Sequence, residues 1–400
     1  MNINIVTDAR FTCLPDGTVW TDTVFGATFW NRYLDAFDSV NVVARLRSSS
    51  AVPHNYVRSD SPLVSFSPVP HYIGPTSYLL RRREVSQAVR RGLDNSGAIV
   101  LRASSQLANL AFIEIRGQNR PFGIEVVGDP SDTFSRGSIK HPLRLYFRRV
   151  FSESLRQQCT TAISASYVTR SSLQERYPPG ASTFATHYSS IELEDDSLVS
   201  SVPPLRHSKR IITVGTLEQR YKGVDVLIDA VAKSRPRHPD IHLVVVGGGR
   251  YQSDLEAQAK RLGIEAQVSF LGSLPPGKAI RDRLDQSDVF VLASRQEGLP
   301  RALIEAMARG LPCVATTVGG IPELLHPEDL VPPNNSAALA ESLSQVLSSL
   351  ERRSSMASRN LAAAEDYLVR KIAPRRQQMY GHLKQATEAW VQSRASGTKK

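Results

Sequence analysis

Short apolar runs alternate with amphipathic helical patterns along most of the chain. In the first half, the runs typical of strands are INIVTDA, VNVVARL, LVSFSPV, AIVLRAS, FGIEVVG and TTAISAS. Helical periodicity lies between them, as in TSYLLRRREVSQAVRRGL and HPLRLYFRRVFSESLRQQ. This alternation predicts parallel α/β architecture, because each helix returns the chain to the end of the sheet where the next strand begins.

The strand pattern starts again in the second half with RIITVGTL, HLVVVGGG, QVSFLGS, VFVLAS and PCVATT. Between the halves, residues 193–209 are polar, Ser-rich and carry a Pro-Pro pair, which predicts a linker. After about Ala337 the pattern becomes helical, with two or three helices broken near Pro374. We therefore expect a first domain at 1–205, a second domain at 209–370, and a last helix at 371–395 that returns to the first domain.

The predicted fold class is α/β, with two doubly wound Rossmann-like domains facing each other across a cleft. Open α/β sheets bind ligands beyond the carboxyl ends of their strands, so the cleft is the expected site. A length of 400 residues with 41% hydrophobic positions fits two domains rather than one. No apolar run is long enough for a transmembrane helix, and the first residues read as a strand rather than a secretory signal.

The net charge limits the classes of binding partner, and the cysteine content bears on metal binding and on the cellular compartment. The formal net charge is +11, which suits nucleic acid, anionic membrane or phosphorylated ligands. We do not expect nucleic acid, because no recognisable binding motif occurs. The three cysteines, Cys13, Cys159 and Cys313, are far apart, which argues against a zinc site and fits a cytoplasmic protein.

Residues 140–156 form a basic amphipathic pattern, with five basic residues, one acidic residue and the aromatic Tyr146, Phe147 and Phe151. A helix of this kind can lie on an anionic membrane surface. The alternative is a solvated face whose aromatic rings belong to the core. The sequence leaves both interpretations open, and the first predicts a peripheral contact with the inner face of the membrane.

The segment SRQEGLPRALIEAMARG, residues 294–310, places Glu297 and Glu305 around an apolar run. Glu297 follows the strand VFVLAS, Gly298 permits a tight turn, and Pro300 suits the start of a helix. An unpaired buried carboxylate is costly, so each glutamate must reach either water or a ligand. The amides at Gly298, Leu299 and the helix start would attract an anion such as phosphate.

Upstream, VGTLEQRYKGVDVLIDA reads as a strand, a loop and a helix, with Arg220 and Lys222 at the end of the loop. A lysine at such a junction is well placed to neutralise a diphosphate. The glycines of LVVVGGGRY do not complete a dinucleotide fingerprint, so NAD is not expected. We expect these glycines to let the backbone pass close under a bound nucleotide.

Together, these blocks over residues 210–325 resemble the donor domain of retaining family-4 glycosyltransferases with the GT-B fold. Glu297 and Glu305 match that family's two glutamates separated by seven residues. The resemblance implies that Glu297 contacts hydroxyls of the donor sugar, Glu305 binds the ribose, and Lys222 neutralises the departing diphosphate. It also implies no metal and no cofactor, the nucleotide sugar being a co-substrate. The remaining donor-binding residues implied are Gly215, Thr216, Arg220, Gly272, Gly298, Leu299, Pro300 and Arg301.

Two positions depart from the family pattern. The family usually has an arginine six residues before the lysine, where this chain has Thr216, so Arg220 either supplies that charge or faces solvent. The family often has a histidine after the strand that here reads FGIEVVGDP. Asp129 in that position is a candidate catalytic contact with the sugar or acceptor, although an Asp-Pro turn is the commoner meaning.

The first domain should bind the acceptor, by analogy with the fold. Residues 16–34 are rich in Gly, Thr and aromatic residues, and Gly26 in this segment is a candidate contact. Its aromatic rings suit a sugar, but Phe25, Phe29, Trp30 and Tyr33 fit one apolar helix face, which favours the core. Arg102 and Ser104 end a strand and are further candidate acceptor contacts.

The sequence thus predicts an enzyme that moves a hexose from a nucleotide-diphosphate sugar, with retention, to a hydroxyl of a saccharide or lipid-linked saccharide. Biosynthesis of a cell-surface polysaccharide or glycan is the expected setting. Two alternatives stay open: a small natural product as acceptor, or a catalytically silent GT-B binding protein, which the departures at Thr216 and Asp129 allow.

Overall fold

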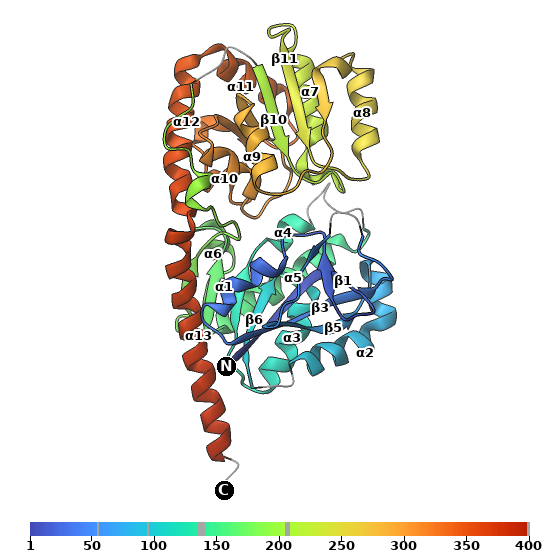
Figure 1. The fold of residues 1–400 in the computed structure, drawn as a ribbon, viewed down its shortest axis with the longest axis vertical. Coiled ribbons are helices and arrows are strands. Elements are labelled where there is room, and N and C mark those ends of the chain that lie inside the picture. The colour runs from blue at the N-terminus through green and yellow to red at the C-terminus, as the bar shows by residue number, and fades with distance from the viewer. Residues whose placement is uncertain (54–55, 94–95, 135–140, 205–208, 398–400) are drawn as a thin grey trace. The chain divides into compact units, whose positions relative to one another are not determined.

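The computed structural model describes residues 1–53, 56–93, 96–134, 141–204 and 209–397. It contains two compact units, each built around its own parallel sheet with helices packed on it (Figure 1). Unit 1 comprises Met1–Gly128, Arg149–Tyr188 and Ala373–Lys400, and unit 2 comprises Asp129–Arg148 and Ser189–Ile372. The prediction of two Rossmann-like α/β domains is confirmed.

The sheet of unit 1 is centred on β1. Its parallel strands follow the order β5-β3-β1-β6-β7-β8-β9. Their bounds are β1 (Asn2–Cys13), β3 (Ser39–Ser48), β5 (Val64–Pro70), β6 (Ala98–Ala103), β7 (Gly123–Val126), β8 (Ser164–Tyr167) and β9 (Phe184–His187). Two short antiparallel strands, β2 (Val19–Thr21) and β4 (Val57–Arg58), extend from the end of β1. The apolar pattern did not predict β2, β4 or β9, which have few buried apolar residues.

The helices of unit 1 are short or amphipathic, and α2 packs on β5 and on α3. Their bounds are α1 (Asn31–Leu34), α2 (Gly74–Gly92), α3 (Gln106–Gly117), the greater part of α5 (Arg144–Thr161), α6 (Ser172–Arg176), and α13 (Val369–Gly397) from Ala373 onward. Ser105 caps α3 by accepting a hydrogen bond from the Ala108 amide at 3.0 Å. Such a cap satisfies an amide that the helix itself cannot use.

Unit 2 contains a six-stranded parallel sheet in the order β12-β11-β10-β13-β14-β15. The strands are β10 (Lys209–Val214), β11 (Ile241–Val246), β12 (Val268–Phe270), β13 (Val289–Leu292), β14 (Cys313–Thr316) and β15 (Leu330–Val331). The strand order reverses between β10 and β13. This reversal opens a crevice at the carboxyl ends of the two strands, where sheets of this type bind ligands.

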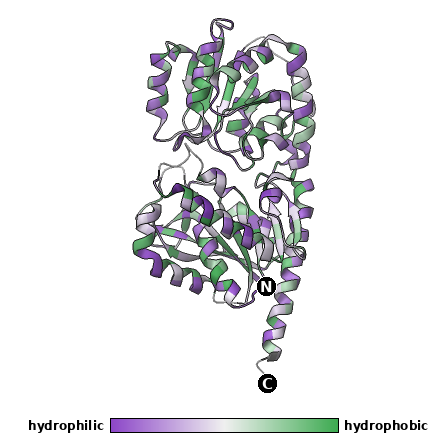
Figure 2. Ribbon diagram, turned by 180° about the vertical axis from the view of Figure 1, so that it is seen from behind, coloured by the Kyte–Doolittle hydropathy of each residue, from purple (hydrophilic) through white to green (hydrophobic). Residues whose placement is uncertain are grey.

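The helices of unit 2 include α4 (Pro130–Thr133), α7 (Val224–Ser234), α8 (Gln252–Arg261), α9 (Lys278–Asp285), α10 (Arg301–Ala308), α11 (Ser336–Ser348) and α12 (Leu350–Ala364). The strands read predominantly apolar in both units, whereas the helices carry polar outer faces (Figure 2). Among the described residues, no helix is both long and apolar enough to cross a membrane.

The predicted linker at 193–209 is packed onto unit 2 over its described part. The Leu193 amide donates to the Tyr367 carbonyl at 3.1 Å, and the Val199 amide donates to the Ala308 carbonyl at 3.0 Å. The contact boundary therefore falls between Tyr188 and Ser189, earlier than the expected 205. The polar composition predicted a linker, but its backbone groups form hydrogen bonds with unit 2, and the side chain of Leu193 is buried.

The predicted break near Pro374 does not occur, because α13 continues through that proline. The chain instead changes direction at the short turn Glu365–Tyr367, before α13 begins at Val369. Pro374 lies within the first two turns of α13, where its missing N–H removes one main-chain hydrogen bond and the helix continues.

Candidate active site

The loops that follow β10 and β13 meet at the carboxyl edge of the unit 2 sheet. The first holds Gly215 to Gly223 and the second holds Ser294 to Pro300. β10 and β13 are neighbours in the sheet, although α7, β11, α8, β12 and α9 lie between them in the chain.

 The sheet therefore brings together two loops that are distant in the chain, at the point where its strand order reverses.

Lys222 and Glu297 form an ion pair across this edge. The Lys222 Nζ lies 2.7 Å from Glu297 Oε1, which also accepts a hydrogen bond from Ser294 Oγ at 2.6 Å. Burial by itself would lower the pKa of Lys222, but Glu297 and Tyr221 together outweigh this effect, so the pKa is raised and the lysine stays charged. No described residue donates to Glu297 Oε2, which leaves that oxygen available to a ligand.

Gly215 makes room for the lysine. A Cβ atom at this position would lie 3.2 Å from the Cγ, Cδ and Cε atoms of Lys222, so the lysine side chain would have to shift to accept a larger residue. The aliphatic stem of Lys222 therefore crosses directly over the end of β10. This contact explains why a glycine follows the strand, and it fixes the direction in which the ammonium group points.

Arg295 holds the two loops together and was not predicted from the sequence. Its guanidinium binds both carboxylate oxygens of Asp225, each at 2.8 Å, and its Nε donates to Asn334 Oδ1 at 2.6 Å. It also donates to the Arg220 carbonyl, while its backbone amide donates to the Tyr221 carbonyl at 2.7 Å. A bidentate arginine with further backbone contacts restrains both loops, and therefore the Lys222–Glu297 pair.

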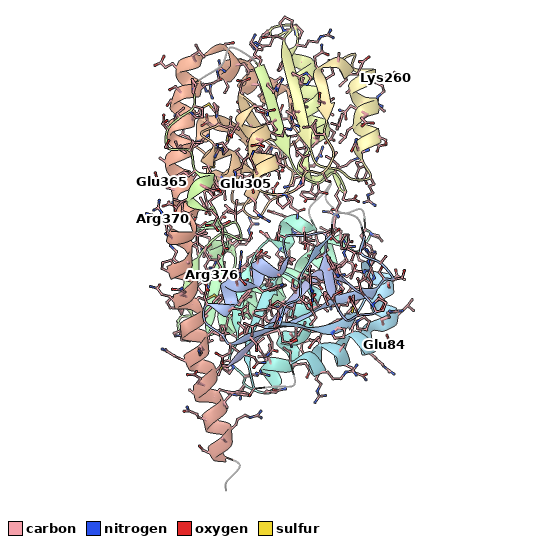
Figure 3. All side chains as sticks on the ribbon, in the orientation of Figure 1. Glu84, Lys260, Glu305, Glu365, Arg370 and Arg376 are labelled. Atoms are coloured by element: carbon pink, nitrogen blue, oxygen red, sulfur yellow. The ribbon has the colours of Figure 1, made fainter. Side chains whose placement is uncertain are left out.

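Glu305 lies on α10, in its second turn, and is partly buried (Figure 3). Burial raises the pKa of its carboxyl group, and the positive charges of Arg301 and Arg281 offset this only in part. No hydrogen bond from a described residue reaches the carboxylate. The side chain thus has the unsatisfied acceptor capacity that a hydroxyl-bearing ligand would fill.

The start of α10 supplies main-chain donors. Pro300 is the N-cap residue, one position earlier than predicted, and no side chain caps the helix. The amides near Gly298, Leu299 and Arg301 therefore stand at the positive end of the helix dipole, where an anion is favoured. The loop is supported from below by the Gly320 amide, which donates to the Gly298 carbonyl at 2.7 Å.

The glycines after β11 allow close packing between loops. A Cβ atom at Gly247, where φ is +137°, would lie 1.9 Å from the Gly215 carbonyl oxygen. The Gly247 amide donates to the Gly272 carbonyl at 2.8 Å, and the Leu217 amide donates to the Gly248 carbonyl at 2.9 Å. These glycines let neighbouring loops of the protein pack closely, and a close approach to a bound nucleotide stays a prediction.

Thr216 and Arg220 are exposed and lie apart from the ion pair. Thr216 Oγ1 accepts from the Glu218 amide at 3.2 Å, which shapes the loop. The Arg220 guanidinium pairs with Asp254 at 2.8 Å and lies 5.0 Å from the centre of the Tyr251 ring. In this structure Arg220 is therefore held toward α8, and a role in binding phosphate stays a prediction.

Asp129 is buried and caps a helix. Its carboxylate accepts a hydrogen bond from the Ser131 amide at 2.7 Å, at the start of α4. This is the Asp-Pro turn that was the alternative interpretation of the sequence. The capping bond accounts for the aspartate structurally, and a catalytic contact stays a prediction.

In unit 1, the structure places Arg102 in the interior, with its side chain 8% exposed, rather than at an open surface. It forms an ion pair with the buried Glu125 and donates to the Tyr33 hydroxyl at 3.2 Å. Glu125 also accepts hydrogen bonds from the hydroxyl groups of Tyr33, Tyr188 and Tyr380. These partners correct the expectation that Arg102 is presented to an acceptor.

The other two acceptor candidates are more accessible. Ser104 is partly exposed, just after β6, and Gly26 lies in a partly exposed loop where a Cβ atom would come within 3.2 Å of Val57. Of the aromatic residues in the same segment, Phe29, Trp30 and Tyr33 are buried, as the pattern favoured. Among the described residues, no group of three or more His, Cys, Asp or Glu side chains is arranged to hold a metal ion.

Residues 201–361 match the family model of the group 1 glycosyl transferases. The match contains both loops of the site and both glutamates, and it leaves the first half of the chain outside. The match supports the resemblance of this part of the chain to glycosyltransferases.

Curated relatives extend the similarity to different degrees. Protein CapJ of Staphylococcus aureus is 26% identical over 338 residues, which is 82% of each chain. The gpi3 subunit of phosphatidylinositol N-acetylglucosaminyltransferase of Schizosaccharomyces pombe is 30% identical over 148 residues, 36% of this chain and 32% of that protein. The chain therefore spans most of CapJ but only about a third of the second relative.

Solved structures share the fold of the whole chain. Sucrose-phosphate synthase from Thermosynechococcus elongatus has a TM-score of 0.70 at 17% identity, over 96% of this chain and 99% of that one. Anabaena HepE in complex with UDP and glucose has a TM-score of 0.66 at 17% identity, over 95% and 98%. Both neighbours are GT-B glycosyltransferases, so the fold class is GT-B.

Proposed function

We propose that this protein is a retaining hexosyltransferase that uses a nucleotide-diphosphate sugar and a saccharide acceptor in polysaccharide or glycan biosynthesis. The observation that carries the proposal is the Lys222–Glu297 pair at the reversal point of the unit 2 sheet, 2.7 Å apart and mostly buried. The bound UDP in HepE and the match of residues 201–361 to glycosyl transferases support a nucleotide-sugar donor.

In this mechanism the nucleotide lies over the ends of β10 and β13. The ribose hydroxyls donate to the unsatisfied carboxylate of Glu305, and Glu297 Oε2 accepts from hydroxyls of the sugar. The amides at Gly298 and Leu299 and the start of α10 hold the diphosphate. The residues Gly215, Thr216, Arg220, Gly272, Pro300 and Arg301 are proposed to complete the donor pocket.

Transfer breaks the bond between the anomeric carbon and the diphosphate oxygen and forms a bond to the acceptor hydroxyl on the same face. Negative charge develops on the departing diphosphate, and Lys222 with the positive pole of α10 would stabilise it. Groups held in place before the reaction lower the barrier without reorganisation at the moment of transfer. In this proposal that electrostatic role needs no metal ion.

Nucleotide binding tests the donor site directly. We expect one of UDP, GDP and ADP to raise the melting temperature of the full chain, since a ligand at about 100 times its Kd stabilises a protein by roughly 2.7 kcal/mol. Lys222→Ala should lose the ligand-induced shift, whereas Lys233→Ala, an exposed lysine on α7, should keep it. A nucleotide-induced shift of the same size in both variants would contradict the assigned role of Lys222.

The stereochemical part of the proposal has its own test. Proton NMR of the reaction mixture gives the anomeric configuration of the first product formed from the identified sugar nucleotide. The configuration should be that of the donor. An inverted product would leave the donor site standing and refute retention.

We also propose that the basic helix contacts an anionic membrane. On α5, Leu145 and Tyr146 are 64% and 61% exposed, and Arg148 and Arg149 are exposed beside them; Lys140 lies outside the described residues. The gpi3 relative belongs to an enzyme that is named for a membrane lipid, phosphatidylinositol.

Sedimentation with vesicles tests this contact. At low salt, the wild-type chain should sediment with phosphatidylglycerol vesicles, and the variant Arg148→Glu/Arg149→Glu should sediment with them less. Equal sedimentation of the two proteins would refute the contact.

A further inference from the structure

The carboxyl edge of the unit 1 sheet carries a concentration of arginines. Arg10 on β1 pairs in register with Arg45 on β3, and Thr12 pairs with Arg47. The strand next to β3 is β5, which ends just before His71, and Arg81 on α2 donates to the His71 carbonyl at 3.4 Å. We call Arg10, Arg45, Arg47 and Arg81 the arginine cluster. Its members come from two adjacent strands and a helix, at the edge where such sheets bind ligands.

The charges of the cluster act on one common point. Burial lowers the pKa of the His71 ring, and repulsion by Arg45, Arg10, Arg47 and Arg81 lowers it further. All four guanidinium groups therefore lie within electrostatic reach of this side chain. An anion placed near it would be attracted by the same four charges.

The protein neutralises little of this charge itself. Among the described residues, the carboxylate that pairs with the cluster is Asp8, whose Oδ1 lies 3.9 Å from Arg45 Nε. Arg47 donates to two neutral groups, Thr12 Oγ1 at 3.0 Å and the Tyr56 hydroxyl at 2.9 Å. Four arginines against one aspartate leave an excess of positive charge, which is unfavourable for the folded protein alone.

Arg10 is the clearest sign of a missing partner. Its side chain is exposed, and it forms no hydrogen bond or ion pair with any described residue. Arg45, by contrast, is 15% exposed and donates to the Tyr72 carbonyl at 3.1 Å, so it has a structural use. Arg10 therefore contributes charge to the edge without contributing to the packing.

An exposed apolar strip adjoins the arginine cluster in the chain. Ile73 and Leu79 are each 65% exposed and Leu80 is 84% exposed, between His71 and Arg81. Leu79 and Leu80 belong to the first half of α2, and Ile73 is its N-cap residue. The helix continues with an exposed polar stretch that includes Glu84, labelled in Figure 3. Large apolar side chains exposed beside a basic group are typical of a surface that meets an amphipathic ligand.

We propose that the arginine cluster binds the phosphate or diphosphate of the acceptor, and that Leu79 and Leu80 contact an apolar chain attached to that phosphate. This inference rests on the proposed glycosyltransferase function and specifies its acceptor as a lipid-linked phosphosaccharide. Arginine forks match phosphate oxygens with paired hydrogen bonds, and several arginines along one sheet edge suit a group with more than one negative charge. The apolar strip distinguishes a lipid-linked phosphate from a free one.

Calorimetric titration of the full chain with inorganic pyrophosphate tests the charged part. Because pyrophosphate would also enter the proposed donor site, the titrations are made in the wild type and in a Lys222→Ala background. In both proteins, Arg10→Ala should weaken the binding of pyrophosphate to the arginine cluster about tenfold, because the substitution removes one charge-assisted hydrogen bond. Arg116→Ala, an exposed arginine on α3, is the matched control and should change nothing.

Geranyl diphosphate tests the apolar part. It should bind about tenfold more tightly than pyrophosphate, and Leu80→Ser should remove that difference while leaving pyrophosphate binding unchanged. Ile113→Ser is the matched control, because Ile113 on α3 is 68% exposed.

Each negative result has a separate meaning. Equal pyrophosphate binding by Arg10→Ala and Arg116→Ala would overturn the phosphate site. Equal binding of geranyl diphosphate and pyrophosphate would overturn the lipid-linked acceptor and leave a free phosphosaccharide. Failure of the donor assignment would appear instead in the nucleotide-induced melting shift, which does not involve the arginine cluster.

Discussion

The carboxyl edges of the two sheets are built in opposite ways. In unit 2, Lys222 and Glu297 form an ion pair, and Arg295 binds both of the loops that carry them. Backbone atoms of neighbouring loops occupy the space that side chains would need at the glycine positions. In unit 1, the edge carries charges with few internal partners, and Arg10 has none among the described residues. One edge is organised in advance, whereas the other carries an excess of positive charge.

This difference fits the different tasks proposed for the two edges. A site that stabilises charge developing during a reaction gains from groups that are already fixed. A site that only has to hold a charged acceptor gains from excess charge, which attracts the ligand over a distance. Each of the following predictions tests one side of this contrast, from the largest expected effect to the smallest.

The largest effect should follow Glu297→Gln. Removing the negative charge leaves Lys222 without its partner and takes away the proposed sugar contact, so the transfer rate should fall by roughly 10²–10³. Circular dichroism should show an intact fold. Glu265→Gln, an exposed glutamate of unit 2, is the control. Wild-type transfer by Glu297→Gln would mean that the organised edge is not the reaction site.

In unit 1, Arg102→Met should act on stability rather than on acceptor binding. The variant leaves Glu125 buried without its counter-charge, which costs about 3–5 kcal/mol of unfolding free energy. Urea denaturation should show this loss, and Arg102→Met/Glu125→Gln should lose less. A stable Arg102→Met protein with a raised acceptor KM would restore Arg102 to the acceptor site.

Arg295→Lys tests whether the unit 2 edge depends on its support. A lysine cannot bind both Asp225 oxygens, so the two loops should separate slightly and kcat/KM should fall about 10-fold to 100-fold. The matched control is Arg309→Lys, which breaks a similar bidentate pair with Asp285. If both variants lose the same activity, general destabilisation and not loop position is responsible.

The smallest effect should be the pH dependence contributed by Glu305. Its pKa in the folded state is raised by burial, so ionisation disfavours folding, and this penalty appears as the pH rises from the unfolded value through the raised one. Relative to wild type, Glu305→Gln should therefore gain stability with rising pH over that window. Urea titrations at several pH values measure the difference, and a difference that shrinks with rising pH would contradict the sign.

Ionisation of Glu305 should have the opposite effect on nucleotide binding, which it should strengthen. Ribose hydroxyls that donate to Glu305 favour the ionised carboxylate, so wild-type affinity for the responding nucleotide should increase as pH rises through the raised pKa. Glu305→Gln should lack this trend. Calorimetry in two buffers of different ionisation enthalpy would detect the released proton, and identical proton release by both proteins would exclude Glu305.

The sequence by itself determined the two parallel sheets and the loops that hold Lys222, Glu297 and Glu305. These follow from local patterns, because apolar strands, loop glycines and helix starts are encoded within a few neighbouring residues. The same local pattern also predicted α10 within one or two residues of its observed bounds. Arg295 lies inside the motif, but its partner Asp225 is 70 residues away, so its role could not be predicted.

Only the tertiary structure decided which charged side chains are used inside the fold. Arg102 was expected at a ligand and instead pairs with Glu125, among hydroxyls contributed by Tyr33, Tyr188 and Tyr380 from distant parts of the chain. No sequence pattern identified Arg10, which lies next to Arg45 in the sheet and has no partner among the described residues. Whether a charge is neutralised depends on contacts between residues far apart in sequence, and neither composition nor spacing specifies those contacts.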